Sequence, residues 1–312
     1  MGSEAPWGAI ATTVAATGLL ILVAARLSRR SKAVVKGAIT DLHRFAVKGL
    51  ERDSLGACAL PVGGCLPSDR AWALMREDKH HEFDPADPKW VNKMSFFAAC
   101  SAGQTLAQFT TAYDDESTTL VVRDKHSGKL LLEERLGDPQ GRNAADLFFT
   151  SRLFEGPGSA AVRLVRAAAG REHQFGNTSS GVEASGDVRT VHLVNRETVR
   201  ALSEAAGVEL DPLVFRANVL FEGVAPWEEF QWVGRRIALG PEVRLRVVKR
   251  TVRCAATCVD LGAAARGPDV PGLLQRHFPE HGPYLGVYAQ VVRAGTVRVG
   301  DDVQPCEWLE WL

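Results

Sequence analysis

Hydrophobic and polar residues alternate in short runs along most of the chain from about residue 38 onward. Successive side chains of a strand point to opposite faces of a sheet, so such alternation predicts strands that are buried on one face. The runs lie at 38–47, 71–75, 190–194, 212–223 and 242–254. The pattern therefore predicts a fold of the α+β class that is mainly β.

Two longer stretches predict strands joined by turns. Residues 106–134 are rich in Val, Thr, Phe and Tyr and are interrupted by polar turns at Asp114–Ser117 and His126–Gly128, which predicts a three-strand meander. Residues 284–303 predict a hairpin that turns at Ala294 and Gly295.

Helical patterns are few. Apolar residues recur on one face over 143–154, which predicts a helix. A second helix is predicted from Asn195, whose side chain suits an N-cap, to a stop at Gly207. Residues 176–189 are rich in Gly and Ser and predict a loop between two domains.

The first residues differ from the rest. Residues 8–25 carry no charge and are followed by basic residues at Arg26, Arg29 and Arg30. Basic residues on that flank favour a single N-terminal membrane anchor whose following body faces the cytosol. A transit peptide or a weakly ordered tail are the alternatives. The predicted organisation is therefore an anchor or targeting segment over 1–37, a first domain over 38–175 and a second over 176–312.

Composition excludes little but is informative about charge. Apolar residues make up 46% of the 312 residues, and 37 basic residues balance 37 acidic ones. A nucleic-acid-binding protein commonly carries a basic excess, so no nucleic-acid partner is expected. The six cysteines show no spacing typical of a small disulfide-rich domain, and most are expected to be buried thiols.

One local stretch concentrates both basic residues and thiols. "TVRCAATCVD" (251–260) follows a basic run and places Cys254 and Cys258 four positions apart, a spacing that fits neither a redox dithiol nor half of a zinc site. Basic neighbours favour the thiolate, which is the form that binds metals. Arginines also bind phosphate. The alternative is a solvated strand edge protected by basic residues.

Several motifs occur in an order that resembles a known family. "FRAN" (215–218), "VRCAATCVD" (252–260), "GVY" (286–288) and "GTVRVGD" (295–301) resemble the molybdenum-cofactor sulfurase C-terminal domain, abbreviated MOSC. Upstream, "AVKG" (46–49) and "SDRAWALM" (68–75) resemble the N-terminal β-barrel domain that precedes MOSC in the amidoxime-reducing group. The resemblance implies that the first domain is β-barrel-like and that the second is a MOSC β-barrel with a few helices.

The resemblance also implies a set of site residues around a molybdenum cofactor, a molybdopterin that carries one metal ion. Cys254 would be the molybdenum ligand and, with Asp260 as an acid–base group, a catalytic residue. The pterin and its phosphate would be held by Lys48, Arg70, Asn195, Arg216, Asn218, Arg253 and Tyr288. For Asp260 the alternative is a turn residue. Cys258 is expected to be a bystander, and the alternative is a second thiol near the metal.

One departure from the family pattern affects the phosphate contact. The family has P-V-K-S where this chain has "AVKG", so Gly49 replaces a Ser that follows the Lys. Either one phosphate contact is lost or the backbone N–H of Gly49 replaces it.

The function implied by the resemblance is a molybdenum-dependent reductase of N-hydroxylated compounds such as amidoximes. Its expected partners are a cytochrome b5 with an NADH-dependent reductase as external electron donor, a small N-hydroxylated substrate, and a membrane through the N-terminal segment. In the eukaryotic members of that group this membrane is the outer mitochondrial membrane. The alternatives are a carrier of cofactor or sulfur that uses the same Cys254, and a purely structural member of the family.

Overall fold

The computed structural model describes residues 36–154, 161–176 and 189–306. The described residues lie in one compact unit, which begins at Lys36. Its described α-helices are α2 (Ala99–Leu106), α3 (Pro139–Leu153), α4 (Arg196–Ala206) and α5 (Val270–His277). Short 3-10 helices are η1 (Glu77–Glu82), η2 (Lys93–Ser95), η3 (Pro212–Phe215), η4 (Glu228–Trp232) and η5 (Ala255–Thr257).

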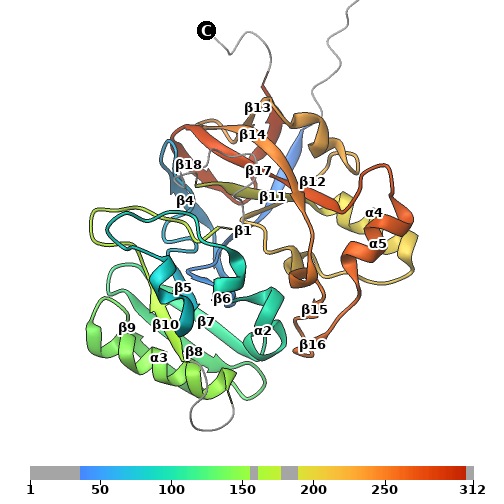
Figure 1. Cartoon of the computed structure of the whole chain (residues 1–312). Coiled ribbons are helices and arrows are strands. Elements are labelled where there is room, and N and C mark those ends of the chain that lie inside the picture. Colours follow the sequence, from blue (N-terminus) through green and yellow to red (C-terminus); the bar gives the residue numbers. More distant parts are fainter. Residues whose placement is uncertain (1–35, 155–160, 177–188, 307–312) are drawn as a thin grey trace, which may run out of the picture. The chain divides into compact units, whose positions relative to one another are not determined.

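Seven strands close into a barrel, which forms the upper part of Figure 1. The order is β12-β11-β17-β14-β13-β19-β1, and β1 pairs back with β12, while β3 extends the sheet beyond β1. The strands are β1 (Gly37–Arg44), β3 (Asp53–Leu55), β11 (Val191–Asn195), β12 (Val219–Glu222), β13 (Arg236–Leu239), β14 (Val243–Val252), β17 (Tyr284–Arg293) and β19 (Asp302–Pro305). The strand from the start of the described chain therefore completes a barrel built mostly from its second half.

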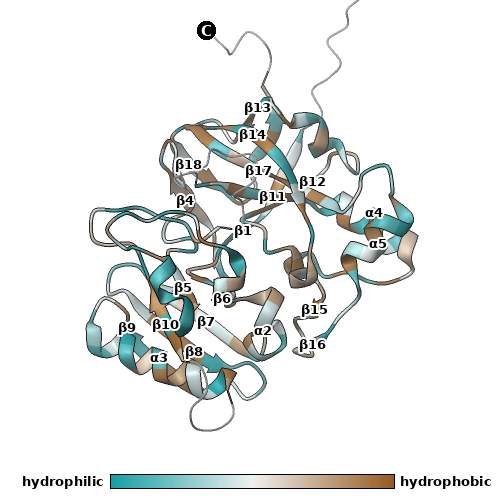
Figure 2. Cartoon of the chain, viewed as in Figure 1, coloured by the Kyte–Doolittle hydropathy of each residue, from teal (hydrophilic) through white to brown (hydrophobic). Residues whose placement is uncertain are grey.

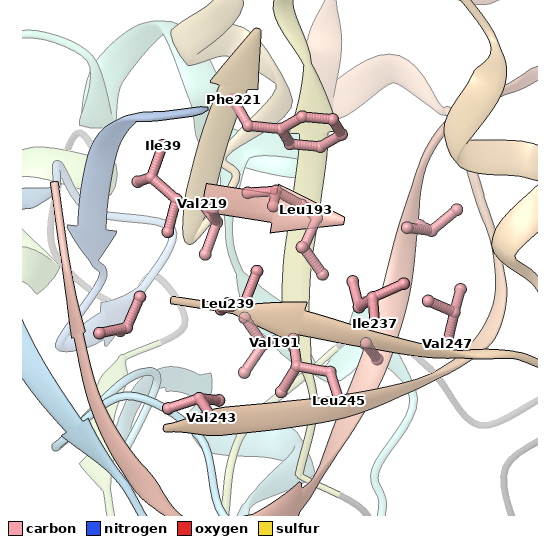
Figure 3. Close-up of a cluster of buried hydrophobic side chains, with 14 of the residues drawn as sticks. Ile39, Val191, Leu193, Val219, Phe221, Ile237, Leu239, Val243, Leu245 and Val247 are labelled. Atoms are coloured by element: carbon pink, nitrogen blue, oxygen red, sulfur yellow. The ribbon is translucent and has the colours of Figure 1, made fainter. Parts of the chain in front are cut away.

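Alternating side chains of these strands fill the barrel. Figure 3 shows inward-pointing residues from several strands, among them Ile39, Leu193, Val219 and Leu245, all of which are at most 2% exposed. Such burial contributes about 1.5–3 kcal/mol for each large aliphatic side chain. This core holds the strands in fixed positions. The polar side chains at the strand ends are therefore fixed as well.

The remaining β structure forms smaller sheets. One contains β10, β5 and β2, with β6 paired to β5, and a second is the meander β7-β8-β9. The two-stranded sheets are β18-β4 and β15-β16. Their bounds are β2 (Val47–Lys48), β4 (Ala57–Leu60), β5 (Trp72–Arg76), β6 (Phe96–Phe97), β7 (Phe109–Asp114), β8 (Thr119–Asp124), β9 (Leu130–Arg135), β10 (Val162–Val165), β15 (Val259–Asp260), β16 (Ala265–Arg266) and β18 (Gly295–Arg298). In Figure 2 the strands carry many of the hydrophobic residues, and polar residues are frequent on α3 and α4.

The predicted fold class, mainly β with a few helices, is confirmed. The meander is also confirmed, and α4 begins after Asn195, whose side chain accepts a hydrogen bond from the N–H of Glu197, and ends at Gly207 in the left-handed conformation. The helix predicted from 143 begins earlier, at Pro139. Gly141 makes this start possible, because a Cβ there would lie 2.2 Å from the carbonyl oxygen of Arg135.

The predicted hairpin over 284–303 is wrong. β17 ends at Arg293, and the next strand, β18, pairs with β4 near the start of the chain instead of folding back on β17. The N–H of Thr296 donates to the carboxylate of Glu242, and Val297 is fully buried in the barrel core. Burial of Val297 against the barrel core therefore outweighs the local turn signal.

The domain boundaries remain a prediction. None of the helices within the described ranges is both long and apolar enough to cross a membrane. The predicted anchor at 8–25 lies outside the described residues, as does most of the predicted loop at 176–189.

Candidate functional site

Seven of the predicted site residues line one cleft, which encloses about 110 Å³. These residues are Lys48, Arg70, Arg216, Asn218, Arg253, Cys254 and Tyr288. Lys93 also lines the cleft, so five cationic side chains face it, and no Asp or Glu belongs to its described lining. The enclosed part is smaller than a whole organic cofactor, so it suits one end of such a group, with the rest in the mouth of the cleft.

Cys254 follows directly after β14 and begins the short helix η5. Its backbone is held because its carbonyl oxygen accepts hydrogen bonds from the N–H and the hydroxyl of Thr257, both at 2.9 Å. The thiol is half-buried and lines the cleft. The barrel strand therefore presents this thiol at a fixed point of the cleft wall.

Arg253 lies in the barrel end beside Cys254 and is 6% exposed. Its Nε donates to the carbonyl of Leu285 at 2.8 Å and its Nη1 to the carbonyl of Phe215 at 3.3 Å. Burial lowers the pKa of this guanidinium to about 10. A charge this deep is costly unless it is paired, and its described partners are neutral.

His192 is a site residue that the sequence did not indicate. Its Nε2 accepts a hydrogen bond from Arg253 Nη2 at 2.9 Å, so the proton lies on Nδ1, which is 3.3 Å from the carbonyl oxygen of Arg216. Burial, and then the charge of Arg253, lowers the pKa of the ring well below its usual value, so the ring is neutral. The imidazole ring lies 4.8 Å from the ring of Tyr288. His192 thus connects two arginines of the cleft.

Arg70 and Arg216 both lie against the ring of Phe45, with their guanidinium carbons 4.7 and 4.2 Å from its centroid. Both residues have positive φ, 51° and 53°, a strained conformation for a side chain of this size that is often found at functional sites. Arg70 is paired with Asp69 and also donates to the carbonyl of Arg216. Burial, followed by the charge of Arg70, lowers the pKa of Arg216 to about 9.

Arg216 Nη2 is the clearest sign of a missing acceptor. This atom is buried and has no hydrogen-bond partner in the described structure. An unpaired guanidinium N–H in a buried position costs free energy unless an acceptor reaches it. An anionic group bound in the cleft is the kind of acceptor that this atom fits.

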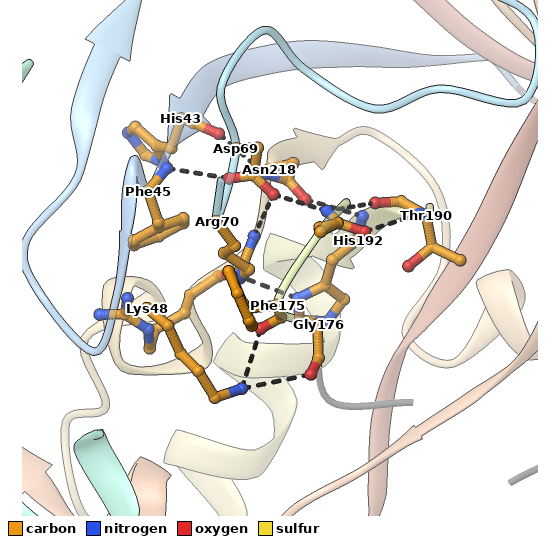
Figure 4. Close-up of polar contacts among 12 residues, drawn as sticks. His43, Phe45, Lys48, Asp69, Arg70, Phe175, Gly176, Thr190, His192 and Asn218 are labelled. Atoms are coloured by element: carbon orange, nitrogen blue, oxygen red, sulfur yellow. Dashed lines mark hydrogen bonds and ion pairs between the residues drawn. The ribbon is translucent and has the colours of Figure 1, made fainter. Parts of the chain in front are cut away.

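Lys48 closes the cleft on the side of the first half of the chain and is 8% exposed. Figure 4 shows its ammonium nitrogen bonded to the carbonyl oxygens of Phe175 and Gly176, at 2.9 and 3.2 Å. Burial, then the charges of Arg70 and Arg216, lowers its pKa to about 7. A bound anion would reverse that shift because it favours the ammonium form.

Gly49 explains the departure from the family pattern after Lys48. Its φ is +95°, and a Cβ there would lie 2.8 Å from the Cα of Ala98. A Ser side chain therefore does not fit this backbone. The residue lines the cleft.

A buried carboxylate holds the cleft wall together. Asp69 accepts hydrogen bonds from Arg70 Nη1 at 2.5 Å, from Gln174 Nε2 at 2.7 Å and from the N–H of Phe45 at 2.9 Å (Figure 4). Gln174 in turn accepts from the N–H of Thr190. The network fixes Arg70 against the first strand of the second half of the chain.

Asn218 lines the cleft and also ties the barrel together. Its amide donates to the carbonyl of His43 at 3.0 Å and accepts from the N–H of His192 at 3.1 Å. Its side chain thus joins β1 and β11 at the cleft. Cys100, from α2, also lines the cleft.

The structure does not bring Asn195 and Asp260 to the cleft lining. Asn195 caps α4 and donates to the carbonyl of Ala225 at 2.9 Å and to the carboxyl of Glu229. Asp260 is exposed, and its carboxylate accepts hydrogen bonds from the N–H groups of Gly262 and Ala263. These bonds are those of a turn residue, which was the alternative to an acid–base group. Cys258 lies 3.9 Å from the carboxylate of Asp269 and is likewise not among the cleft residues.

Glu229 is a fully buried carboxyl held by the predicted site residue Asn195. It also accepts from the hydroxyl of Thr198 at 3.0 Å, and burial raises its pKa to about 7. A carboxyl with a higher pKa in the folded protein binds its proton more tightly there than in the unfolded chain. Its stabilising contribution is therefore complete below about pH 4.5 and is lost as pH rises through about pH 7.

The Glu229→Gln variant is expected to lose this dependence. The difference in free energy of unfolding between this variant and the wild type should increase by about 3 kcal/mol, in favour of the variant, from about pH 4.5 to about pH 8. The pKa of Glu229 is raised from 4.5 to about 7, and each pKa unit corresponds to about 1.4 kcal/mol. Urea titrations across that range measure the difference. Glu228→Gln is the matched control and should keep the wild-type slope. An unchanged slope in Glu229→Gln would contradict the raised pKa.

Comparisons with known proteins find one family in the second half of the chain and relatives of differing coverage. Residues 172–304 match the MOSC domain family. The mitochondrial amidoxime reducing component 2 of Bos taurus is 24% identical over 325 residues, which cover 89% of this chain and 86% of that protein. The molybdenum cofactor sulfurase of Anopheles gambiae is 28% identical over 149 residues, which cover 44% of this chain but 18% of the sulfurase.

Solved structures show more distant similarity. The YUAD protein of Bacillus subtilis matches with a TM-score of 0.36 at 12% identity, covering 86% of this chain and 95% of that one. YiiM of Geobacillus stearothermophilus matches with a TM-score of 0.29 at 19% identity, covering 38% of this chain and 54% of that one.

Proposed function

We propose that the protein is a molybdenum-cofactor-dependent oxidoreductase that reduces N-hydroxylated compounds, on the premise that residues 172–304, which match the MOSC domain family, form a MOSC domain. The observation that carries the proposal is the charge of the cleft: five cationic side chains and no described carboxylate surround a half-buried thiol. Such a lining favours a bound anion. The similarity to an amidoxime reducing component along 89% of the chain supports the choice of reaction.

The residues present fit the cofactor. Cys254 would hold the metal, because a thiolate is a soft ligand suited to transition metals. Lys48, Arg70 and Arg216 would hold the terminal phosphate, and the unpartnered Arg216 Nη2 supplies a free donor for it. When bound, the molybdenum cofactor supplies the two-electron redox chemistry. Asn218 and Tyr288 would lie along the pterin.

The chain's own residues would then position and stabilise charge. Arg253 precedes Cys254 in the chain and lines the same cleft, so it would hold the anionic cofactor beside the ligating thiol. Neutral His192 keeps Arg253 in place by accepting its hydrogen bond. Lys48 would take up a proton when a phosphate binds at neutral pH, because its pKa of about 7 rises beside an anion.

The overall reaction balances with an external electron source. An amidoxime takes up two electrons and two protons, its N–O bond breaks, and an amidine and water leave. In this proposal the electrons come from a cytochrome b5 and its NADH-dependent reductase. The test is reduction of benzamidoxime by the purified, cofactor-loaded protein with that donor system. Formation of benzamidine supports the proposal, and its absence from a protein shown to contain molybdenum would refute it.

A second candidate uses the same thiol to carry sulfur or cofactor. The similarity of 149 residues to a molybdenum cofactor sulfurase favours it. Here Cys254 would hold a sulfane sulfur or transfer the cofactor to another protein. Cyanide-releasable sulfur that disappears in Cys254→Ser, in a protein without benzamidoxime reduction, would identify this role.

The location of the protein is the remaining part of the proposal. The Bos taurus relative is named as mitochondrial, and residues 8–25 are uncharged. We therefore expect a membrane-attached protein whose body faces the cytosol, at the outer mitochondrial membrane.

Deleting residues 1–35 tests the membrane attachment, because this deletion leaves β1 intact from Gly37. The shortened protein is expected to remain in the soluble fraction and to keep its molybdenum. The measurement is fractionation of cells, followed by metal analysis. A shortened protein that still sediments with membranes would show that the attachment lies elsewhere in the chain.

A further inference from the structure

A second cavity, of about 630 Å³, lies next to the cleft and shares no lining residue with it. The two are close because consecutive residues divide between them. Residues 69, 173 and 189 line the second cavity. The residues that follow them in the chain, 70, 174 and 190, line the cleft. A single layer of chain therefore separates the two cavities, and nothing in the proposed reaction uses the second.

The carboxylates of the second cavity are already paired. Asp69 is bound by Arg70 and Gln174, and its side chain is fully buried. Glu172 forms an ion pair with Arg189, the third arginine of the cavity. Neither carboxylate is therefore available to neutralise further positive charge there.

Two further arginines leave the cavity with an excess of positive charge. Arg166 and Arg171 are exposed, line the cavity, and form no ion pair with a described residue. Both arginines also line a neighbouring cavity of about 520 Å³, to which Trp72 belongs, and the guanidinium carbon of Arg166 lies 5.2 Å from the ring of Trp72. A guanidinium presents forked donors to a carboxylate, sulfonate or phosphate group. The two arginines thus form a place for an anionic group.

Part of the lining of the cavity is apolar. Ala59, Pro61 and Pro67 are exposed and supply this apolar surface, whereas Leu60 and Leu66 are each 1% exposed and belong to the barrel core. A volume of this size, with apolar walls and a few charged groups, is typical of sites for small organic ligands, which occupy roughly 300–1,000 Å³. A plain inorganic ion would use only the arginines and leave the apolar wall in contact with water.

We propose that this cavity is a second ligand site, which binds an organic anion with an apolar body. The anionic group would lie at Arg166 and Arg171, and the apolar body would lie on Pro61 and Pro67. The site is independent of the molybdenum proposal, because it shares no lining residue with the cleft.

The test uses a fluorescent probe of this chemistry, 8-anilinonaphthalene-1-sulfonate, on the full chain loaded with cofactor. N-phenyl-1-naphthylamine, the same body without the sulfonate, is the neutral comparison. The double variant Arg166→Gln/Arg171→Gln should weaken binding of the sulfonate about tenfold or more, since two charged hydrogen-bond donors are lost. Affinity for the neutral probe should change less than about threefold.

Matched controls locate the probe. Arg152→Gln removes an exposed arginine that also lies over an aromatic ring, Phe148, but is not among the lining residues of the cavity, and should leave binding unchanged. Lys93→Gln removes a cation of the cleft and should also leave it unchanged. The proposal is overturned if the wild type does not bind the sulfonate below about 1 mM. It is also overturned if the double variant binds it like the wild type, or if Lys93→Gln weakens it instead.

Discussion

Replacing Cys254 by Ser is expected to abolish reduction of benzamidoxime by the reconstituted electron-transfer chain. The substitution keeps the size of the side chain but replaces a soft thiolate with a hydroxyl, which is a poor ligand for molybdenum. Loss of residues that only support a ligand typically costs about 10–100-fold, so loss of the ligand itself should lower activity by more than about 100-fold. The measurement is the rate of benzamidine formation per folded protein.

Cys258→Ser is the matched control for this variant. Cys258 lies only four residues away but outside the cleft lining, next to Asp269, where burial raises the pKa of its thiol. Its loss should leave the rate within about twofold of the wild type. A Cys254→Ser protein that keeps half of its activity, or a Cys258→Ser protein that loses it, would overturn the assignment of the metal ligand.

Replacing Lys48 by Met is expected to lower cofactor retention about tenfold or more. Met keeps most of the side-chain volume but removes the ammonium group that would pair with the phosphate, and a hydrogen bond to a charged group contributes about 1.5–3 kcal/mol. The measurement is molybdenum per chain after extensive dialysis, at matched protein concentration.

Two comparisons separate a lost contact from a lost fold. Lys129→Met removes an exposed lysine beside the turn between β8 and β9 and should retain the cofactor like the wild type. Without cofactor, Lys48→Met should be at least as stable as the wild type, because the burial that lowers the pKa of Lys48 also makes its charge costly. Full retention of molybdenum by a folded Lys48→Met protein would exclude Lys48 from the phosphate site.

Short sequence motifs identified much of the cleft because many of their residues lie next to the ends of barrel strands, where the cleft is formed. Arg253 and Cys254 follow directly after the end of β14. Arg216 and Asn218 come just before the start of β12. His192 was missed because its importance comes from pairing between strands: it lies opposite Tyr288 in the sheet and bonds to Arg253, and neither relation is visible along the chain.

Other features could not be separated by sequence alone. An Asn at the start of a helix is both a good cap and a possible pterin ligand, and the structure shows Asn195 in the first role, bound to Glu229. Asp260 presents the same ambiguity between a turn and an acid–base group. The strand β18 pairs with residues near position 58, and a local turn pattern contains no information about such a distant partner.

The central claim, that this cleft holds a molybdenum cofactor through Cys254, is tested most directly by the composition of the purified protein. Elemental analysis, combined with detection of the pterin released on denaturation, should give about one molybdenum and one pterin per chain from a host that makes the cofactor. Cys254→Ser should lower the molybdenum value sharply. A folded wild-type protein from that host with neither molybdenum nor pterin would contradict the account.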